Sequence, residues 1–170
     1  MDPLAATDAW LRDVVIGLNL CPFAAAPYGR GGVRSVESRA TEPAELLAEV
    51  LDESNVLLEG GAETTLLVIP QLGLGFEELL DLVEIGEHVL EERGLGADIQ
   101  LVAFHPDYVF ADGEGPDDPA NATNRSPHPT IHLLLAVEVE QIIATHPDIA
   151  EIPTRNVALL RAMAKEGQSV

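Results

Sequence analysis

Side chains that can act in catalysis or metal binding are concentrated in one long polar stretch, from Phe104 to His132. This stretch contains three of the chain's five histidines and separates two apolar segments. Loops of this length inside a domain are usually either functional or disordered. The stretch also contains aromatic residues and Arg125, which disordered spacers seldom carry. We therefore predict a functional loop, and we expect its acidic middle, residues 112–118, to be solvated surface.

His105 and Asp107 stand at the start of this loop, directly after an apolar segment that is typical of a buried strand. An imidazole at a strand end can act as a general acid or base, and a neighbouring carboxylate such as Asp107 can orient it. The alternative is a loop anchored by polar hydrogen bonds, in which neither residue is catalytic.

Cys21 is the single cysteine of the chain, so no internal disulfide can form. A cysteine acts as a nucleophile or metal ligand only as the thiolate. We expect Cys21 where the first helix ends, and the negative end of the helix dipole disfavours a thiolate there. Activation therefore requires His105 or an arginine from elsewhere in the chain. The alternative is a buried structural thiol.

Arg125 is one of only nine basic residues in a strongly acidic chain. A guanidinium can hold a carboxylate or phosphate through two hydrogen bonds, which favours an anionic substrate group. Asn124 precedes it, and Arg155 and Asn156, at the start of the last predicted helix, can join the same pocket. The alternative is that Arg125 pins the loop to Asp117 or Asp118.

A metal site is a second interpretation of the same residues. His128 and His132 have the spacing of two imidazoles on one helix face, but His128 lies between two prolines and is expected outside the helix. A set made of Cys21, His105 and His132 would suit zinc, copper or iron. The cofactor is otherwise open. No dinucleotide fingerprint or P-loop occurs in the sequence, so NAD and ATP are not expected.

The spacing of apolar residues predicts helices separated by strands, and hence an α/β fold with a mainly parallel sheet of three to four strands. We expect one domain over residues 1–170, with 166–170 as a frayed tail and the functional loop after the last strand. The predicted strands are 33–38, 64–70 and 99–104. The predicted helices are 7–20, 42–58, 75–93, 129–145 and one beginning at Pro153.

The composition limits the range of partners. There are 29 acidic residues against 9 basic ones, so nucleic acids and anionic membranes are poor partners. The apolar runs are too short to span a bilayer. No basic leader segment is visible, so we expect a cytoplasmic protein. Lysine depletion with an acid excess is typical either of a high-salt cytoplasm or of a GC-rich genome.

Four motifs follow one another along the chain: WLRDVVIGLNLCPFA at 10–24, FHPDYVF at 104–110, TNRSPHPTIHLL at 123–134 and IPTRN at 152–156. Together they resemble the small bacterial family described as domain of unknown function fourteen-fifteen. The chain departs from the family pattern at Leu135, where arginine is usual, and at His128, where an aromatic residue is usual. The resemblance implies a stand-alone cytoplasmic protein of about this length and supplies no activity.

Three hypotheses follow. The first is an enzyme for a small anionic metabolite, with Cys21, His105 and Asp107 in catalysis and with Arg125 and Arg155 holding the anion. Its pocket is expected where the HPDY, NRSP and CPF segments converge. The second is a metal-binding protein. The third is a non-catalytic structural or adaptor module whose motifs fasten the long loop. The sequence does not indicate an oligomeric state.

Overall fold

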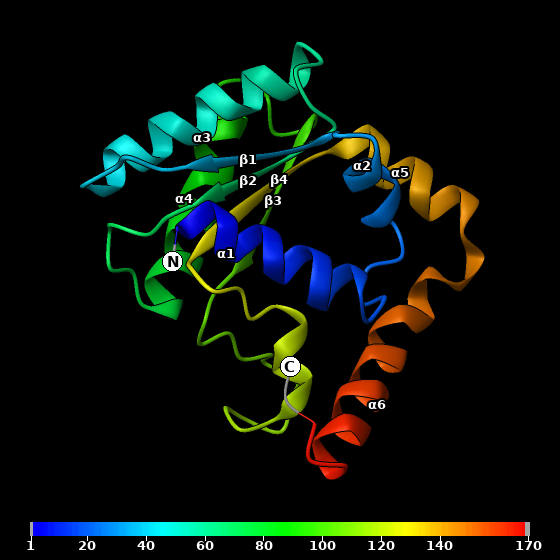
Figure 1. Ribbon diagram of the computed structural model, residues 1–170. Helices are drawn as coiled ribbons and strands as arrows, with labels where there is room; N and C mark the ends of the chain where they lie inside the picture. The colour runs from blue at the N-terminus through cyan, green and yellow to red at the C-terminus, as the bar shows by residue number, and fades with distance from the viewer. Residues whose placement is uncertain (1, 169–170) are drawn as a thin grey trace.

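The computed structural model describes residues 2–168 and contains a four-stranded sheet in the order β1-β2-β4-β3 (Figure 1). The strands are β1 (Val33–Glu37), β2 (Thr64–Val68), β3 (Ile99–Phe104) and β4 (Thr130–Leu135). The helices are α1 (Pro3–Trp10), the π-helix η1 (Leu11–Ile16), α2 (Ala25–Gly29), α3 (Pro43–Leu58), α4 (Phe76–Glu92), the 3₁₀ helices η2 (Pro119–Thr123) and η3 (Pro147–Glu151), α5 (Ala136–Thr145) and α6 (Ile152–Lys165).

The sheet is mixed, which corrects the expectation of a mainly parallel one. β1 and β2 are parallel, whereas β4 is antiparallel to both of its neighbours, β2 and β3. The α/β class and the number of strands are as predicted. Because β4 alone is reversed, the carboxyl ends of β1, β2 and β3 still lie at the same edge of the sheet.

The prediction of a helix over 129–145 is wrong in its first half. Residues 130–135 form β4, and the helix α5 begins only at Ala136. The side chains of β4 are buried or half-buried on both sides, so its apolar run has no alternation to distinguish it from a buried helical segment. The long loop therefore does not follow the last strand. It joins the adjacent antiparallel strands β3 and β4.

Helices cover both faces of the sheet. The helices α3 and α4 pack on one face over a core that includes Leu46, Leu79 and Leu133. On the other face, α1 crosses the sheet in front of the strands (Figure 1), and Trp10 and Leu66 lie in the cluster between them. Alternate residues of each strand supply the two cores because successive side chains of a strand point to opposite faces.

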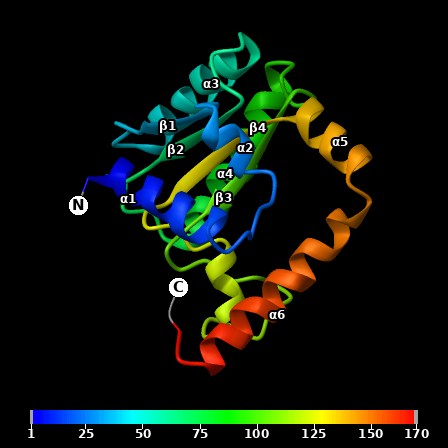
Figure 2. The same ribbon diagram turned by 45° about the vertical axis from the view of Figure 1, so that its right-hand side comes forward.

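The segment from α5 to α6 forms an arm that runs outward from the end of β4 and returns beside the long loop (Figure 2). The arm is held by few buried side chains: Ala136 in α5, and Asn156 and Leu160 in α6. Residues 166–168 of the expected frayed tail form a turn bonded back to Met163, and 169–170 lie outside the described residues. Within 2–168, no helix combines the length and the hydrophobicity needed to cross a bilayer.

Candidate functional site

The long loop between β3 and β4 is an ordered structure built on its own hydrogen bonds. Its two ends meet where the His105 N–H donates to the Asn124 carbonyl at 3.1 Å. Asn121 is fully buried, and its side chain accepts from the Phe110 N–H at 3.0 Å and donates to the Gly115 carbonyl at 2.8 Å. The start and end of the loop, which carry the HPDY and NRSP motifs, are therefore in direct contact.

His105 is buried, and both of its ring nitrogens are engaged. Nδ1 accepts from the Asp107 N–H at 3.0 Å, so the proton is on Nε2, which donates to the Leu74 carbonyl at 2.9 Å. The ring packs against Phe76 at the start of α4. Asp107 is exposed and contacts the ring through its backbone N–H. This geometry suits an anchor for the loop, because no ring nitrogen is left to transfer a proton.

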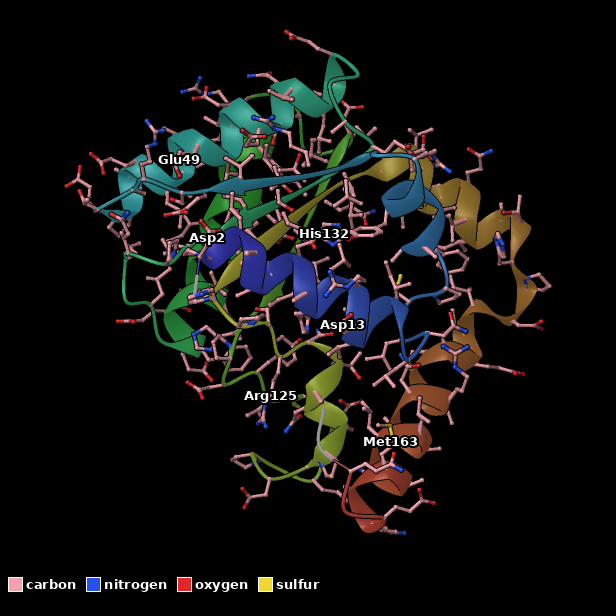
Figure 3. All side chains as sticks on the ribbon, in the orientation of Figure 1. Asp2, Asp13, Glu49, Arg125, His132 and Met163 are labelled. Carbon is pink, nitrogen blue, oxygen red and sulfur yellow. The ribbon has the colours of Figure 1, made fainter. Side chains whose placement is uncertain are left out.

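Arg125 also fastens the loop, through carbonyl groups instead of aspartates. Its Nε donates to the Tyr108 carbonyl at 3.1 Å, and its Nη2 donates to the Pro116 carbonyl at 2.7 Å. Figure 3 shows the side chain on the loop, below α1. Arg125 thus fastens the loop, as in the alternative interpretation, but its partners are main-chain carbonyls and not an aspartate.

Cys21 is half-buried against the cluster beneath α1. Burial raises the pKa of its thiol, an effect only partly opposed by the N–H groups of Phe23 and Ala24, which donate to the sulfur. The helical segment ends earlier than predicted, at Ile16, so a turn separates Cys21 from it. Cys21 is accordingly a neutral thiol at physiological pH, as the buried-thiol alternative requires.

His132 lies on β4, behind α1 (Figure 3), with its ring stacked on Phe104 at 5.7 Å between centroids. Its Nε2 is 2.6 Å from the Thr64 hydroxyl, which itself donates to the Leu133 carbonyl. Nε2 must therefore carry the proton. Burial lowers the pKa of His132 to about 4, so the ring is neutral at pH 7.

The described part of the chain, residues 2–168, contains no group of three or more His, Cys, Asp or Glu side chains that could hold a metal ion. Cys21, His105 and His132 are therefore not assembled as a ligand set. His105 turns toward α4, whereas His132 packs on the opposite face of the sheet with Phe104.

Arg155 and Asn156 reach the segment just before Cys21 from the other end of the sequence. Asn156 is buried and donates to the Leu20 carbonyl at 2.7 Å, while its oxygen accepts from Arg155 Nη2 at 3.1 Å. Arg155 also donates to the carbonyl of Asn19, which has a φ of 53°, a conformation that asparagine tolerates better than most residues. These bonds attach the first turn of α6 to the CPF turn.

A cavity of about 480 Å³ lies between the long loop and α6. All four sequence motifs contribute to its wall, through Leu20, Phe110, Asn124 and Asn156. Asn124 uses its backbone N–H and carbonyl within the loop, so its carboxamide is the group available to a ligand. The α6 residues that line the cavity recur about once per turn and so lie on one helix face: Ile152, Pro153, Asn156, Val157 and Arg161.

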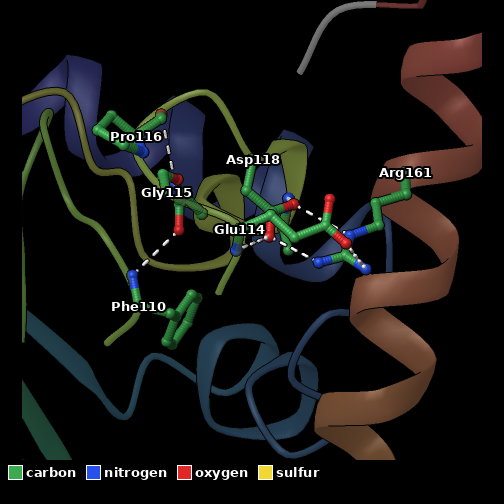
Figure 4. Close-up of polar contacts among 8 residues, drawn as sticks. Phe110, Glu114, Gly115, Pro116, Asp118 and Arg161 are labelled. Carbon is green, nitrogen blue, oxygen red and sulfur yellow. Dashed lines mark hydrogen bonds and ion pairs between the residues drawn. The ribbon is translucent and has the colours of Figure 1, made fainter. Parts of the chain in front are cut away.

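Asp118 and Arg161 form the polar centre of this cavity (Figure 4). The Asp118 side chain is fully buried and accepts from Arg161 Nε at 3.1 Å and from Nη2 at 2.7 Å. It also accepts from the N–H groups of Glu114 and Ala120, both at 3.0 Å. The Arg161 guanidinium and these N–H groups hold the pKa of Asp118 far below its usual range.

The sequence interpretation missed both residues. It placed Asp118 in solvated surface or, as an alternative, beside Arg125, but the fold buries this carboxylate against α6 and pairs it with Arg161. The available signal was Arg161 itself, a rare cation four residues after Val157 on the apolar face of the last helix.

A second, more open groove of about 860 Å³ lies between the CPF turn and the corner of α5 and α6. Phe23 and His146 meet there edge to face, with 4.8 Å between ring centroids. Arg155 lines this groove and not the smaller cavity. The structure therefore separates Arg155 from Asn124: of the predicted binding residues, Arg155 lines the groove, whereas Asn124 and Asn156 line the smaller cavity.

Comparison with curated proteins and with solved structures found no match to this chain. Comparison with protein families found one that covers almost the whole sequence, residues 2–169. The family is the one that the four motifs indicated, and those motifs supply the wall of the smaller cavity. The chain belongs to the family described as protein of unknown function (DUF1415).

Proposed function

We propose that this protein binds a small anionic metabolite in the cavity between the long loop and α6. The observation that carries the proposal is that segments far apart in the sequence meet around this cavity and enclose a partly exposed cation, Arg161. Pockets of a few hundred Å³ with an apolar wall and a few converging polar groups are typical of small-molecule sites.

Arg161 is the anchor for the anion in this proposal. Two of its nitrogens are fixed by the buried Asp118, so the guanidinium is oriented before a ligand arrives, and less side-chain entropy is lost on binding. Asn124 and Thr123 supply polar groups from the loop, and Leu20 and Val157 supply apolar contact from the other side.

The catalytic part of the enzyme hypothesis remains a prediction. Cys21, a neutral thiol, follows the cavity residue Leu20 directly, whereas His105 is committed to two hydrogen bonds. A reaction in the cavity would need a base other than His105. We propose that the protein works in the cytoplasm without nucleic acid, because its net charge of −20 disfavours polyanions.

The non-catalytic module is the second candidate, and the contacts of His105 and Arg125 favour it. Both side chains donate to main-chain carbonyls that shape the loop. If fastening is their whole role, alanine at either position lowers the melting temperature. An enzyme whose reaction used His105 would instead lose activity with little loss of stability.

A thermal-shift screen of small carboxylates and phosphates tests the binding proposal. We expect members of the anionic set to raise the melting temperature of the wild type. Asn124→Asp, which adds a negative charge at nearly constant shape, should abolish that rise. Asn55→Asp, at an exposed site on α3, is the matched control and should keep it. Equal stabilisation of the wild type and Asn124→Asp by the same anions would refute the proposed site.

A further inference from the structure

Glu114 occupies the one nitrogen of Arg161 that Asp118 leaves free. The Glu114 carboxylate lies 2.9 Å from Arg161 Nη1, while Nε and Nη2 are both bonded to Asp118 (Figure 4). Each of the three guanidinium nitrogens therefore contacts a carboxylate of the chain itself, and an anionic ligand must compete with Glu114 for Nη1.

The two carboxylates differ greatly in how easily they can be displaced. The Asp118 side chain has no exposed surface and accepts four hydrogen bonds, whereas the Glu114 side chain is 72% exposed. An exposed ion pair contributes little net stability because water and salt screen it. Glu114 is thus the partner that a ligand can replace, and Asp118 is the fixed support.

The main chain at Glu114 can stay in place while the side chain leaves. The Glu114 N–H donates to Asp118 Oδ2 at 3.0 Å, which holds the backbone. Glycines flank the residue, and Gly115 has a φ of +104° that other residues rarely adopt. Rotation of the Glu114 side chain toward solvent therefore frees Nη1 without unfolding the loop.

We propose that Glu114 is a built-in competitor that mimics the ligand, and that the ligand is a monocarboxylate with an apolar body. The proposal rests on the proposed function of the cavity. The ligand's carboxylate takes the place of the Glu114 carboxylate on Nη1, and its body lies along Leu20, Phe110 and Val157. In the free protein, Glu114 keeps the cation neutralised.

A carboxylate is favoured over a phosphate by the charges around the cavity. Asp112 and Asp118 both line it, and the chain carries a net charge of −20. A phosphate dianion would meet twice the repulsion of a carboxylate at the same position.

Calorimetric titration of the full chain with three probes of one chain length tests the proposal: hexanoate, hexyl phosphate and hexylamine. Hexanoate should bind more tightly than the other two. Glu114→Gln, which removes the competing charge at constant shape, should tighten hexanoate binding about two- to five-fold, the factor that corresponds to an exposed ion pair. Glu92→Gln, at an exposed site in the last turn of α4, is the control and should leave the affinity unchanged.

The outcomes separate this inference from the proposed function. Equal hexanoate affinity for Glu114→Gln and the wild type would overturn the competitor role while leaving the cavity as an anion site. Tighter binding of hexyl phosphate than of hexanoate would overturn the ligand class. If neither the wild type nor Glu114→Gln binds any of the three probes, this inference is overturned. The proposed binding site is overturned as well only if the thermal-shift screen of small carboxylates and phosphates is also negative.

Discussion

Acidification should destabilise this protein through His132, and the size of the effect follows from its surroundings. The pKa of the ring is lowered to about 4 in the folded state by burial, against about 6.5 in the unfolded chain. Between these values the unfolded state binds more protons, so the free energy of unfolding falls as the pH is lowered from about 6.5 to about 4. Above this window the neutral ring has no such effect.

The shift corresponds to about 3 kcal/mol, and we expect about 2–3 kcal/mol because the residue is only partly buried and solvent screens it to some extent. The matched variant is His132→Gln, whose amide nitrogen can still donate to the Thr64 hydroxyl but does not titrate. Loss of stacking on Phe104 lowers its stability by an amount that does not depend on pH.

Urea unfolding at a series of pH values from about 7 to about 4 provides the assay. Carboxylates titrate in both proteins, so the informative quantity is the difference between the two free energies of unfolding. As the pH approaches 4, the free energy of unfolding of the wild type should fall to that of His132→Gln or below it. A difference that stays constant over the whole range would show that His132 is not buried as a neutral ring.

Three further predictions concern the cavity, the thiol and the surface. Asp118→Asn should lower the melting temperature by about 5–10 °C because it leaves Arg161 without its buried charged partner. Asp117→Asn, at an exposed site, is the control and should not lower it. Equal melting temperatures of the two variants would contradict the role of the buried pair. Cys21 should react with iodoacetamide at pH 8 at least about tenfold more slowly in the native protein than in urea, because burial raises the pKa of its thiol. The two rates are measured by mass spectrometry, and a native rate equal to or faster than the rate in urea would show that the thiol is activated. Raising KCl from about 0.1 M to about 1 M shortens the Debye length from about 10 Å to about 3 Å. Repulsion among the 29 acidic residues should therefore weaken, and the melting temperature should rise. An unchanged melting temperature would argue against adaptation to high salt.

Local patterns predicted most of the elements. The apolar face and the flanking proline and glycines define α3 almost to the residue, and the uninterrupted apolar run at 99–104 coincides with β3. The segment 130–135 could not be assigned in the same way, because a strand buried on both sides has no periodicity of its own. The segment is a strand because β2 and β3 are not neighbours in the sheet, and residues 130–135 pair with both of them in the place between.

The site was predictable in its parts but not in its arrangement. The motifs correctly indicated that the HPDY and NRSP segments lie together, since His105 bonds to Asn124. The burial and the hydrogen-bond partners of individual side chains, in contrast, depend on tertiary packing, which the motifs do not describe. The loop turns the donors of His105 and Arg125 onto carbonyls, and it carries Asp118 inward to a helix 43 residues away in the sequence.

An NMR titration of the uniformly ¹⁵N-labelled chain with hexanoate tests the central claim most directly, because it locates a ligand residue by residue. The account predicts saturable amide shifts at Leu20, Phe110, Asn124 and Val157, which surround Arg161. Shifts confined to the groove at Phe23, or no saturable shift at all, would contradict it.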